Sequence, residues 1–170
     1  AAPKFEYQDK DMVLTGHVEK TDSGEILVNC YSKPGQILYS KDKGIINWTS
    51  DEGLAGNKTR VSIKTKNGDI YCGTTTGLSI ISSAGEISNF NVSDEFECEY
   101  IMSLYEDRDG VVWVGTDGGG IYLFNSKKII GKITTDNGLA GNVVFKINQD
   151  VDGRYWICTG TGISCYEKNK

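Results

Sequence analysis

The chain has 170 residues, enough for one domain with a sizeable core. Its 18 basic and 23 acidic residues give a net charge of −5, which argues against nucleic acid as a partner, because phosphate binding requires a basic surface. The sequence contains no run of about 18 or more apolar residues, so we expect this segment not to insert into a membrane.

Four polar turns that end in glycine recur along the chain. They occupy residues 20–24, 65–68, 107–110 and 150–153, and their last glycines are 44, 42 and 43 residues apart. A period of this size indicates stacked supersecondary units, each too small to bury its own apolar face. The repeat therefore governs the fold prediction.

Short runs of β-branched and aromatic residues flank each turn and predict strands. In chain order the expected strands are 12–18, 25–30 and 35–39; then 69–74, 77–81 and 86–90; then 101–105, 111–116, 120–124 and 128–134; and finally 144–148, 154–159 and 162–166. We find no stretch of about ten or more residues with a helical period, so no helix is predicted.

Four short antiparallel strands in each unit are typical of a β-propeller blade. We therefore predict an all-β propeller of about four blades, one domain over residues 1–170, with repeats at 11–50, 58–92, 100–135 and 143–168. Residues 4–10 could supply the missing fourth strand of the last unit. The blades would form a small closed ring, part of a larger ring docked to further blades, or half of a homodimer.

Large side chains recur at one position of the second strand in each unit, namely Leu27, Tyr71, Trp113 and Trp156. In a propeller, one face of that strand packs on the next blade, and a flat ring there fills the wedge between two sheets. We predict that Tyr71, Trp113 and Trp156 are structural residues between blades.

The five cysteines are an odd number, which excludes a complete disulfide framework within one chain. The repeat places Cys72, Cys158 and Cys165 at strand positions, where we expect them to be reduced and buried. With one histidine and no Cys-x-x-Cys pair, we expect no zinc site, and the turns offer too few carboxylates for calcium. We expect no cofactor.

Catalytic residues are not evident either. The single histidine, His17, has no nucleophile motif near it, so we predict no catalytic residue and a protein that is not an enzyme. A paired-carboxylate glycosidase stays open as an alternative, because several acids lie in or near loops. They are Asp51, Glu52, Asp94, Glu95, Glu97, Glu99, Asp117 and Asp136.

Antiparallel alternation places two sets of loops on one rim of a propeller: those that lead into each unit, and those that join its second and third strands. This predicted rim is rich in hydroxyl, amide and aromatic groups, which suits a saccharide or another small polar ligand. The candidate ligand-binding residues on it are Asn57, Arg60, Tyr100, Thr116, Asp117 and Asn142.

Residues 101–124 and 144–166 resemble the two-component regulator propeller repeat, and residues 51–57 and 136–142 resemble the segment that introduces it. The resemblance implies a ligand-sensing module of a bacterial receptor, outside the cytoplasmic membrane, in the periplasm or beyond. In this family a membrane helix and a histidine kinase or diguanylate cyclase follow, and several members respond to carbohydrates. The alternatives are a glycan-binding or glycan-active propeller without a signalling role, and a protein–protein interaction scaffold.

Overall fold

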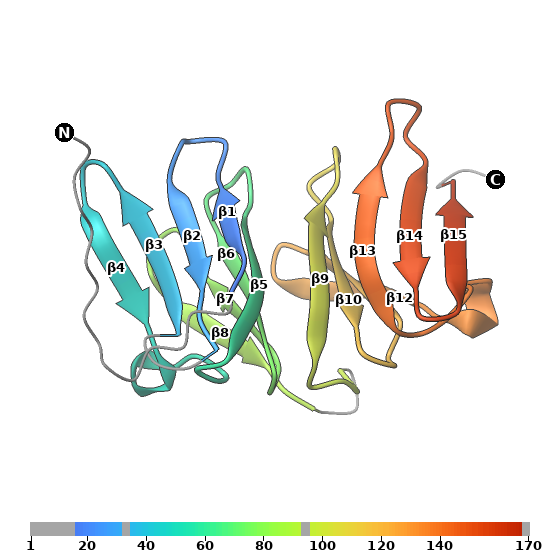
Figure 1. Ribbon diagram of the computed structural model, residues 1–170, viewed down its shortest axis with the longest axis horizontal. Helices are drawn as coiled ribbons and strands as arrows, with labels where there is room; N and C mark the ends of the chain where they lie inside the picture. Colours follow the sequence, from blue (N-terminus) through green and yellow to red (C-terminus); the bar gives the residue numbers. More distant parts are fainter. Residues whose placement is uncertain (1–15, 32–34, 93–95, 168–170) are drawn as a thin grey trace.

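The computed structural model describes residues 16–31, 35–92 and 96–167, in which fifteen strands form four antiparallel sheets (Figure 1). Blade 1 consists of β1 (Val18–Lys20), β2 (Ile26–Asn29), β3 (Gln36–Ser40) and β4 (Gly44–Trp48). Blade 2 consists of β5 (Thr59–Lys64), β6 (Ile70–Thr74), β7 (Leu78–Ile81) and β8 (Ile87–Phe90). Blade 3 consists of β9 (Ile101–Glu106), β10 (Val112–Thr116), β11 (Ile121–Asn125) and β12 (Lys128–Ile133). Blade 4 consists of β13 (Val144–Gln149), β14 (Tyr155–Thr159) and β15 (Gly162–Tyr166).

The predicted all-β propeller architecture is confirmed, and strands within each blade follow one another in sequence order. In the described part of the chain, helical structure is confined to two 3₁₀ turns, η1 (Ser50–Glu52) and η2 (Thr135–Asn137), and no helix there is long and apolar enough to cross a membrane. The first described strand, Val18–Lys20, extends beyond the predicted end at residue 18, because each inner strand continues to its polar turn, and residues 12–15 of the prediction lie outside the described residues.

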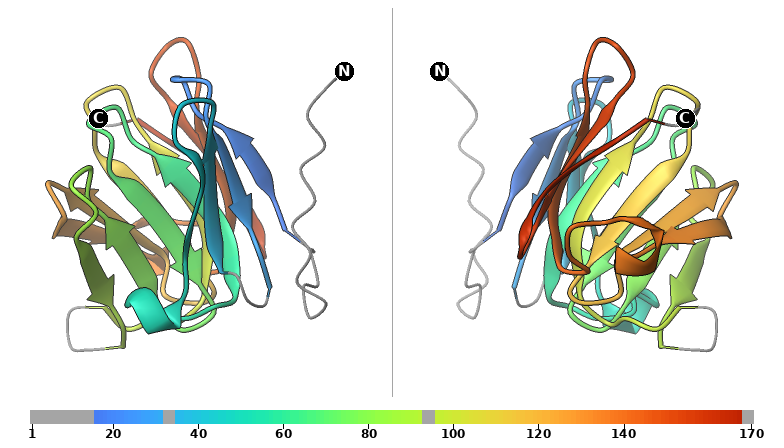
Figure 2. Two further views of the ribbon diagram at one scale, coloured as in Figure 1. Left: turned by 90° about the vertical axis from the view of Figure 1, so that its left-hand side faces the viewer. Right: turned by 90° about the vertical axis from the view of Figure 1, so that its right-hand side faces the viewer.

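The blades stand in an open row, with blade 1 and blade 4 at its two ends (Figures 1 and 2). The inner strands of successive blades are in contact: β5 with β9, and β9 with β13. Among the described residues no strand pairing joins the last blade to the first. The segment 4–10, expected to complete blade 4, lies outside the described residues.

Three hydrophobic clusters hold the row together, one at each junction between blades. Leu27 and Leu38 pack with Ile70, Cys72 and Ile81 between blades 1 and 2. The other clusters repeat this scheme: Tyr71 and Ile80 pack against Val112, Val114 and Phe124, while Trp113 and Ile121 pack against Tyr155, Ile157 and Ile147. We call these two sides the forward face of one blade and the rear face of the next.

Tyr71 and Trp113 are buried at such junctions, with 3% and 1% of their surface exposed. Trp156 differs from the expectation, because 45% of its surface is exposed. The reason is its place on the forward face of the last blade, which no described residue covers.

The cysteines show the same division. All five are free thiols, and Cys72 is buried in the first junction. The expectation of burial is wrong for Cys158 and Cys165, which are exposed. Both lie beside Trp156 on the forward face of blade 4, which no described blade covers, whereas Cys72 lies on the rear face of blade 2 and packs against blade 1.

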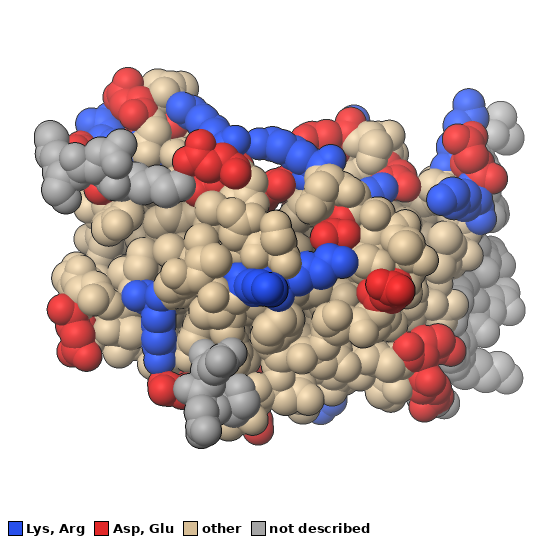
Figure 3. Space-filling model, turned by 180° about the vertical axis from the view of Figure 1, so that it is seen from behind, with Lys and Arg blue, Asp and Glu red and all other residues tan. Residues whose placement is uncertain are grey.

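Charged side chains of both signs are interspersed along the edge that carries the polar turns, and further Lys, Arg, Asp and Glu side chains are scattered over the largely uncharged area below it (Figure 3). This is the appearance of a solvated rim without a field of a single sign. The surface in this view therefore offers no continuous basic track.

Candidate functional site

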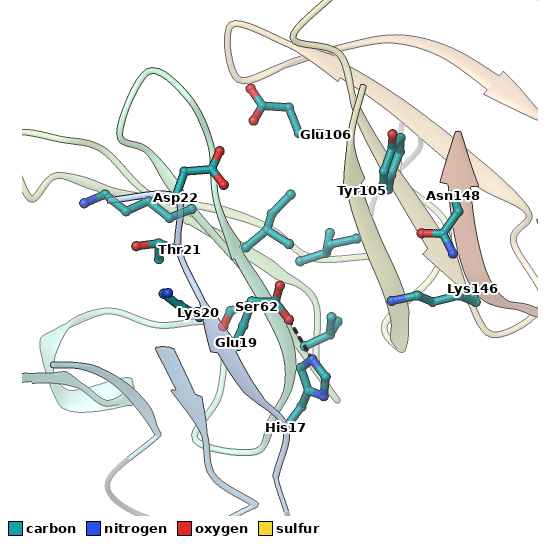
Figure 4. Close-up of a pocket in the computed structure, with 14 residues that line it drawn as sticks. His17, Glu19, Lys20, Thr21, Asp22, Ser62, Tyr105, Glu106, Lys146 and Asn148 are labelled. Atoms are coloured by element: carbon teal, nitrogen blue, oxygen red, sulfur yellow. Dashed lines mark hydrogen bonds and ion pairs between the residues drawn. The ribbon is translucent and has the colours of Figure 1, made fainter. Parts of the chain in front are cut away.

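One hollow of the described structure lies between the inner strands of the blades. It is a cavity of ≈ 340 Å³ lined by the inner strands of all four blades and their flanks: residues 17 and 19–22, 61–64, 104–106, and Lys146 with Asn148 (Figure 4). Its walls run from the middle of each strand to the end where the polar turns begin. We call it the channel cavity, and it brings together residues that are more than a hundred positions apart in the chain.

The charged groups of the channel cavity are balanced. Its lining includes the lysines Lys20, Lys64 and Lys146 and the carboxylates of Glu19, Asp22 and Glu106. Some of these charges are already paired, since His17 Nε2 lies 2.8 Å from Glu19 Oε2 and Lys64 forms an ion pair with Glu25 outside the cavity. Lys146 is exposed, and Figure 4 shows it extending from β13 into the space between the two halves of the row.

The remaining lining offers both apolar contact and hydrogen-bonding groups. Val61, Ile63 and Leu104 supply apolar surface. Burial raises the pKa of Tyr105, so its phenol stays protonated at neutral pH and can donate a hydrogen bond. The Ser62 hydroxyl is buried without a hydrogen-bond partner, at a position where blades 3 and 4 carry Leu104 and Ile147. Such a mixture of apolar and polar groups suits a small polar ligand.

Three of the six residues predicted to bind ligand lie together on the predicted rim, between blades 2 and 3. The Arg60 guanidinium lies 5.1 Å from the centre of the Tyr100 ring and 5.8 Å from that of Tyr31. The Tyr100 carbonyl accepts a hydrogen bond from the exposed Asp117 N–H at 3.0 Å. Arginine stacked between two rings is a rigid platform, but its cationic face is already occupied by them.

The other three have structural partners. Asn57 accepts the Ser50 N–H at 2.7 Å, and Asn142 accepts the Thr135 N–H at 2.9 Å, so both amides tie down the 3₁₀ turns η1 and η2. Thr116 is fully buried and donates to the Gly120 carbonyl at 2.8 Å. None of the six predicted residues lines the channel cavity or either of two further cavities, which lie beside the polar turns of blades 1 and 2 and between the outer parts of those two blades.

The loop acids considered for catalysis are dispersed. Glu52 caps η1 by accepting the Thr49 N–H, and Glu97 pairs with Lys132 on the blade surface, whereas Asp94 and Glu95 lie outside the described residues. Within the described ranges no group of three or more His, Cys, Asp or Glu side chains could hold a metal ion.

The channel residues belong to no motif of the sequence. One signal was available, because the last residue of each inner strand is polar or charged: Lys20, Lys64, Glu106 and Gln149. In a propeller these ends converge on the axis, so their alignment across repeats would have pointed to this end of the channel.

Comparison with known proteins supports the repeat assignment. The family model of the two component regulator propeller matches residues 95–118, which include β9 and β10, and so confirms the resemblance in the third repeat. A search of curated proteins finds no match.

Solved structures share the fold at low sequence identity. The extracellular domain of the putative hybrid two component system BT3049 from B. thetaiotaomicron is 23% identical, with a TM-score of 0.65 over 89% of this chain and 21% of that one. PorZ, a surface component of the type-IX secretion system of Porphyromonas gingivalis, is 16% identical, with a TM-score of 0.67 over 89% of this chain and 25% of that one.

A catalytically inactive virginiamycin B lyase from Staphylococcus aureus, solved with quinupristin, is 14% identical. Its TM-score is 0.70 over 98% of this chain and 59% of that one. The chain thus spans 21% and 25% of the first two structures, and all three likenesses are to the propeller fold.

Proposed function

We propose that this chain is a non-catalytic, ligand-sensing portion of a bacterial signal-transduction receptor and lies outside the cytoplasmic membrane. The observation that carries the proposal is the match of the regulator-propeller repeat to residues 95–118. The fold likeness to extracellular domains of BT3049 and of the BT4673 system is consistent with it. A receptor of this kind needs a polar cavity accessible to solvent, and the channel cavity is the natural candidate.

The ligand that suits this cavity is a saccharide or another small polar molecule. Lys146 and Asn148 of β13 offer hydrogen-bond donors opposite the carboxylates of blade 1, and Tyr105 adds a phenol. The apolar patch of Val61, Ile63 and Leu104 could contact the carbon face of a sugar ring. Because the lining comes from all four blades, an occupant would bridge them and stiffen the row.

A titration of isotope-labelled protein with a saccharide library tests the proposal. We expect amide shifts centred on Tyr105, Lys146 and Asn148, and a loss of affinity of about tenfold or more in Lys146→Met, since a charge-assisted hydrogen bond disappears. Lys128→Met, an exposed lysine on the outer strand β12, is the matched control and should bind normally. Shifts confined to Arg60, Tyr100 and Asp117 would move the site to the predicted rim.

The likeness to virginiamycin B lyase favours an enzyme as the second candidate. Following the same titrations for product formation separates the two functions. Turnover that a single substitution of His17 or Glu19 abolishes would establish an enzyme, whereas unchanged ligand after prolonged incubation would support sensing.

A further inference from the structure

Arg60 differs from the other two arginines of the chain in the use of its N–H groups. Arg108 donates to the Asp150 carbonyl at 2.7 Å. Arg154 pairs with the carboxylates of Asp150 and Asp152. Among the described residues, by contrast, no carboxylate pairs with Arg60 and no acceptor binds its side chain. A guanidinium carries five N–H donors, so this side chain has unused hydrogen-bonding capacity.

Two tyrosine rings restrict the position of the Arg60 guanidinium, which lies over both of them. Tyr31 follows β2 and Tyr100 directly precedes β9, so three successive blades meet at this point of the rim, and all three side chains are partly buried. An aromatic ring attracts a cation through its face, whereas the N–H groups of a guanidinium point outward in its own plane. The rings therefore orient the cation and leave its donors free.

The repeat does not require a cation at this position. Arg60 is the extra residue of a β-bulge, because the register of β5 and β6 shifts between Thr59 and Val61. The same bulge recurs in β9 and β13, where Met102 and Phe145 take the place of Arg60. Bulges re-aim a side chain and are frequent next to functional sites. The fold accepts an apolar residue here, so the arginine of blade 2 serves something other than the repeat.

The two tyrosines are also specific to this part of the rim. The equivalent positions in blade 4 are occupied by Gly160 and Val143, which are joined by the same backbone hydrogen bond that joins Asp117 to Tyr100 in blade 3. Neither ring is therefore needed to build a blade. Three departures from the repeat meet at one point, as expected of a site added to a common fold.

We propose that Arg60, held by Tyr31 and Tyr100, is an anion-binding site that takes the carboxylate group of a small organic acid. The two oxygens of a planar carboxylate match two N–H groups along one edge of a guanidinium. The exposed acids Glu99 and Asp117 adjoin Tyr100, one in sequence and one through its amide, and they disfavour a more highly charged group such as phosphate. This inference is independent of the proposed function, since none of these residues lines the channel cavity.

Titration of isotope-labelled protein with carboxylates tests the site. The probes are glucuronate and N-acetylglycine, which carry the same group on a sugar and on a peptide-like frame, and glucose is the uncharged control. We expect the side-chain N–H resonance of Arg60 and the ring resonances of Tyr31 and Tyr100 to shift with the carboxylates only, with a Kd on the order of 1–10 mM. Binding of one acid alone would identify the frame that carries the carboxylate.

Arg60→Met separates binding from packing, because methionine is the residue that blade 3 carries at this position. We expect it to weaken carboxylate binding by about tenfold or more with an unchanged circular dichroism spectrum, and Arg60→Lys, which keeps the charge but loses the fork, to weaken it by roughly threefold. Arg154→Met removes a guanidinium that is already paired with Asp150 and is the matched control. Lys146→Met should also bind carboxylates normally, which distinguishes this site from the channel cavity.

Carboxylate binding that persists unchanged in Arg60→Met would overturn the proposal. The absence of any shift at Arg60 with either acid at about 50 mM would overturn it as well, and this measurement on the wild-type chain holds even where a variant fails to fold. Binding of inorganic phosphate at Arg60 without binding of a carboxylate would show that the ligand class is wrong.

Discussion

Trp113 and Trp156 occupy the same place in successive blades, and their indole groups make the same local hydrogen bond. Trp113 Nε1 donates to Asp107 at 3.0 Å, and Trp156 Nε1 donates to Asp150 at 2.9 Å. Yet Trp113 is 1% exposed and Trp156 is 45% exposed. The hydrogen bond between the indole and the aspartate of the polar turn is therefore a property of the repeat itself. Burial of the indole depends instead on whether a neighbouring blade covers it.

The two aspartates show the same contrast. Asp107 is buried, and its second side-chain donor is the Tyr155 hydroxyl of the next blade at 2.8 Å. Asp150 is instead paired with Arg154 of its own blade, at 2.8 Å to Nε. The carboxylate at the junction thus accepts a hydrogen bond from the next blade, whereas the one at the end of the row is paired with a cation of its own blade.

The largest expected effect comes from removing the buried indole ring of Trp113. Trp113→Ala should lower the free energy of unfolding by about 3–5 kcal/mol, the range for a large buried aromatic. Trp156→Ala should cost only about 1 kcal/mol, since much of its surface is already in water. Urea unfolding followed by circular dichroism in dilute, monomeric protein measures both. Equal losses would mean that Trp156 is covered within one chain.

Removing the buried carboxylate is the next test. Asp107→Ala leaves the Trp113 N–H and the Tyr155 hydroxyl without an acceptor, so we expect a loss of about 2–3 kcal/mol. Asp150→Ala should be milder, because Trp156 and Arg154 can turn to water. In the background of Asp107→Ala, Tyr155→Phe should partly restore stability, because it removes a hydroxyl that has lost its acceptor. If the stability losses of the two substitutions simply add, the hydrogen bond between Tyr155 and Asp107 does not contribute to stability.

A pair of reciprocal substitutions probes how closely blades approach. A Cβ at Gly115 would lie 2.2 Å from Ser103 Oγ and 2.7 Å from Val144 Cγ1. Gly115→Cys should therefore cost about 1–3 kcal/mol through overpacking. Cys158→Gly, at the same position of blade 4, should change stability little in the monomer. Thermal unfolding of both variants decides whether the close approach is specific to the junction.

The fold could be predicted from sequence because its signals are local and repeated. The polar turns, the strand runs and the recurrent ring all lie within one period, and the structure places them as expected. Burial of Trp156, Cys158 and Cys165 could not be predicted, since it depends on what stands next to blade 4. Blade 4 has the same repeat period as the others, but no described blade packs against its forward face.

The candidate site was less accessible to sequence reasoning. Asn57 and Asn142 have the composition of a ligand rim, but their amides serve the turns that begin with the capping residues Thr49 and Thr134. A Thr followed three positions later by Glu52 or Asn137 is a capping pattern and would have indicated this role. The channel residues follow no motif, because only the convergence of four blades makes them neighbours.

The smallest expected effect is a pH dependence confined to the end of the row. The hydrogen bond from Trp156 holds the pKa of Asp150 below its ordinary value of 3.8, with the backbone N–H and guanidinium of Arg154 acting in the same direction. The folded state therefore favours the carboxylate, and this contribution to stability is present above pH 3.8 and is lost as the pH falls through the lower, folded-state pKa. The Trp156 indole N–H resonance should shift in that acidic range and stay constant in Asp150→Asn. A resonance that moves near neutral pH instead would show that another group controls this hydrogen bond.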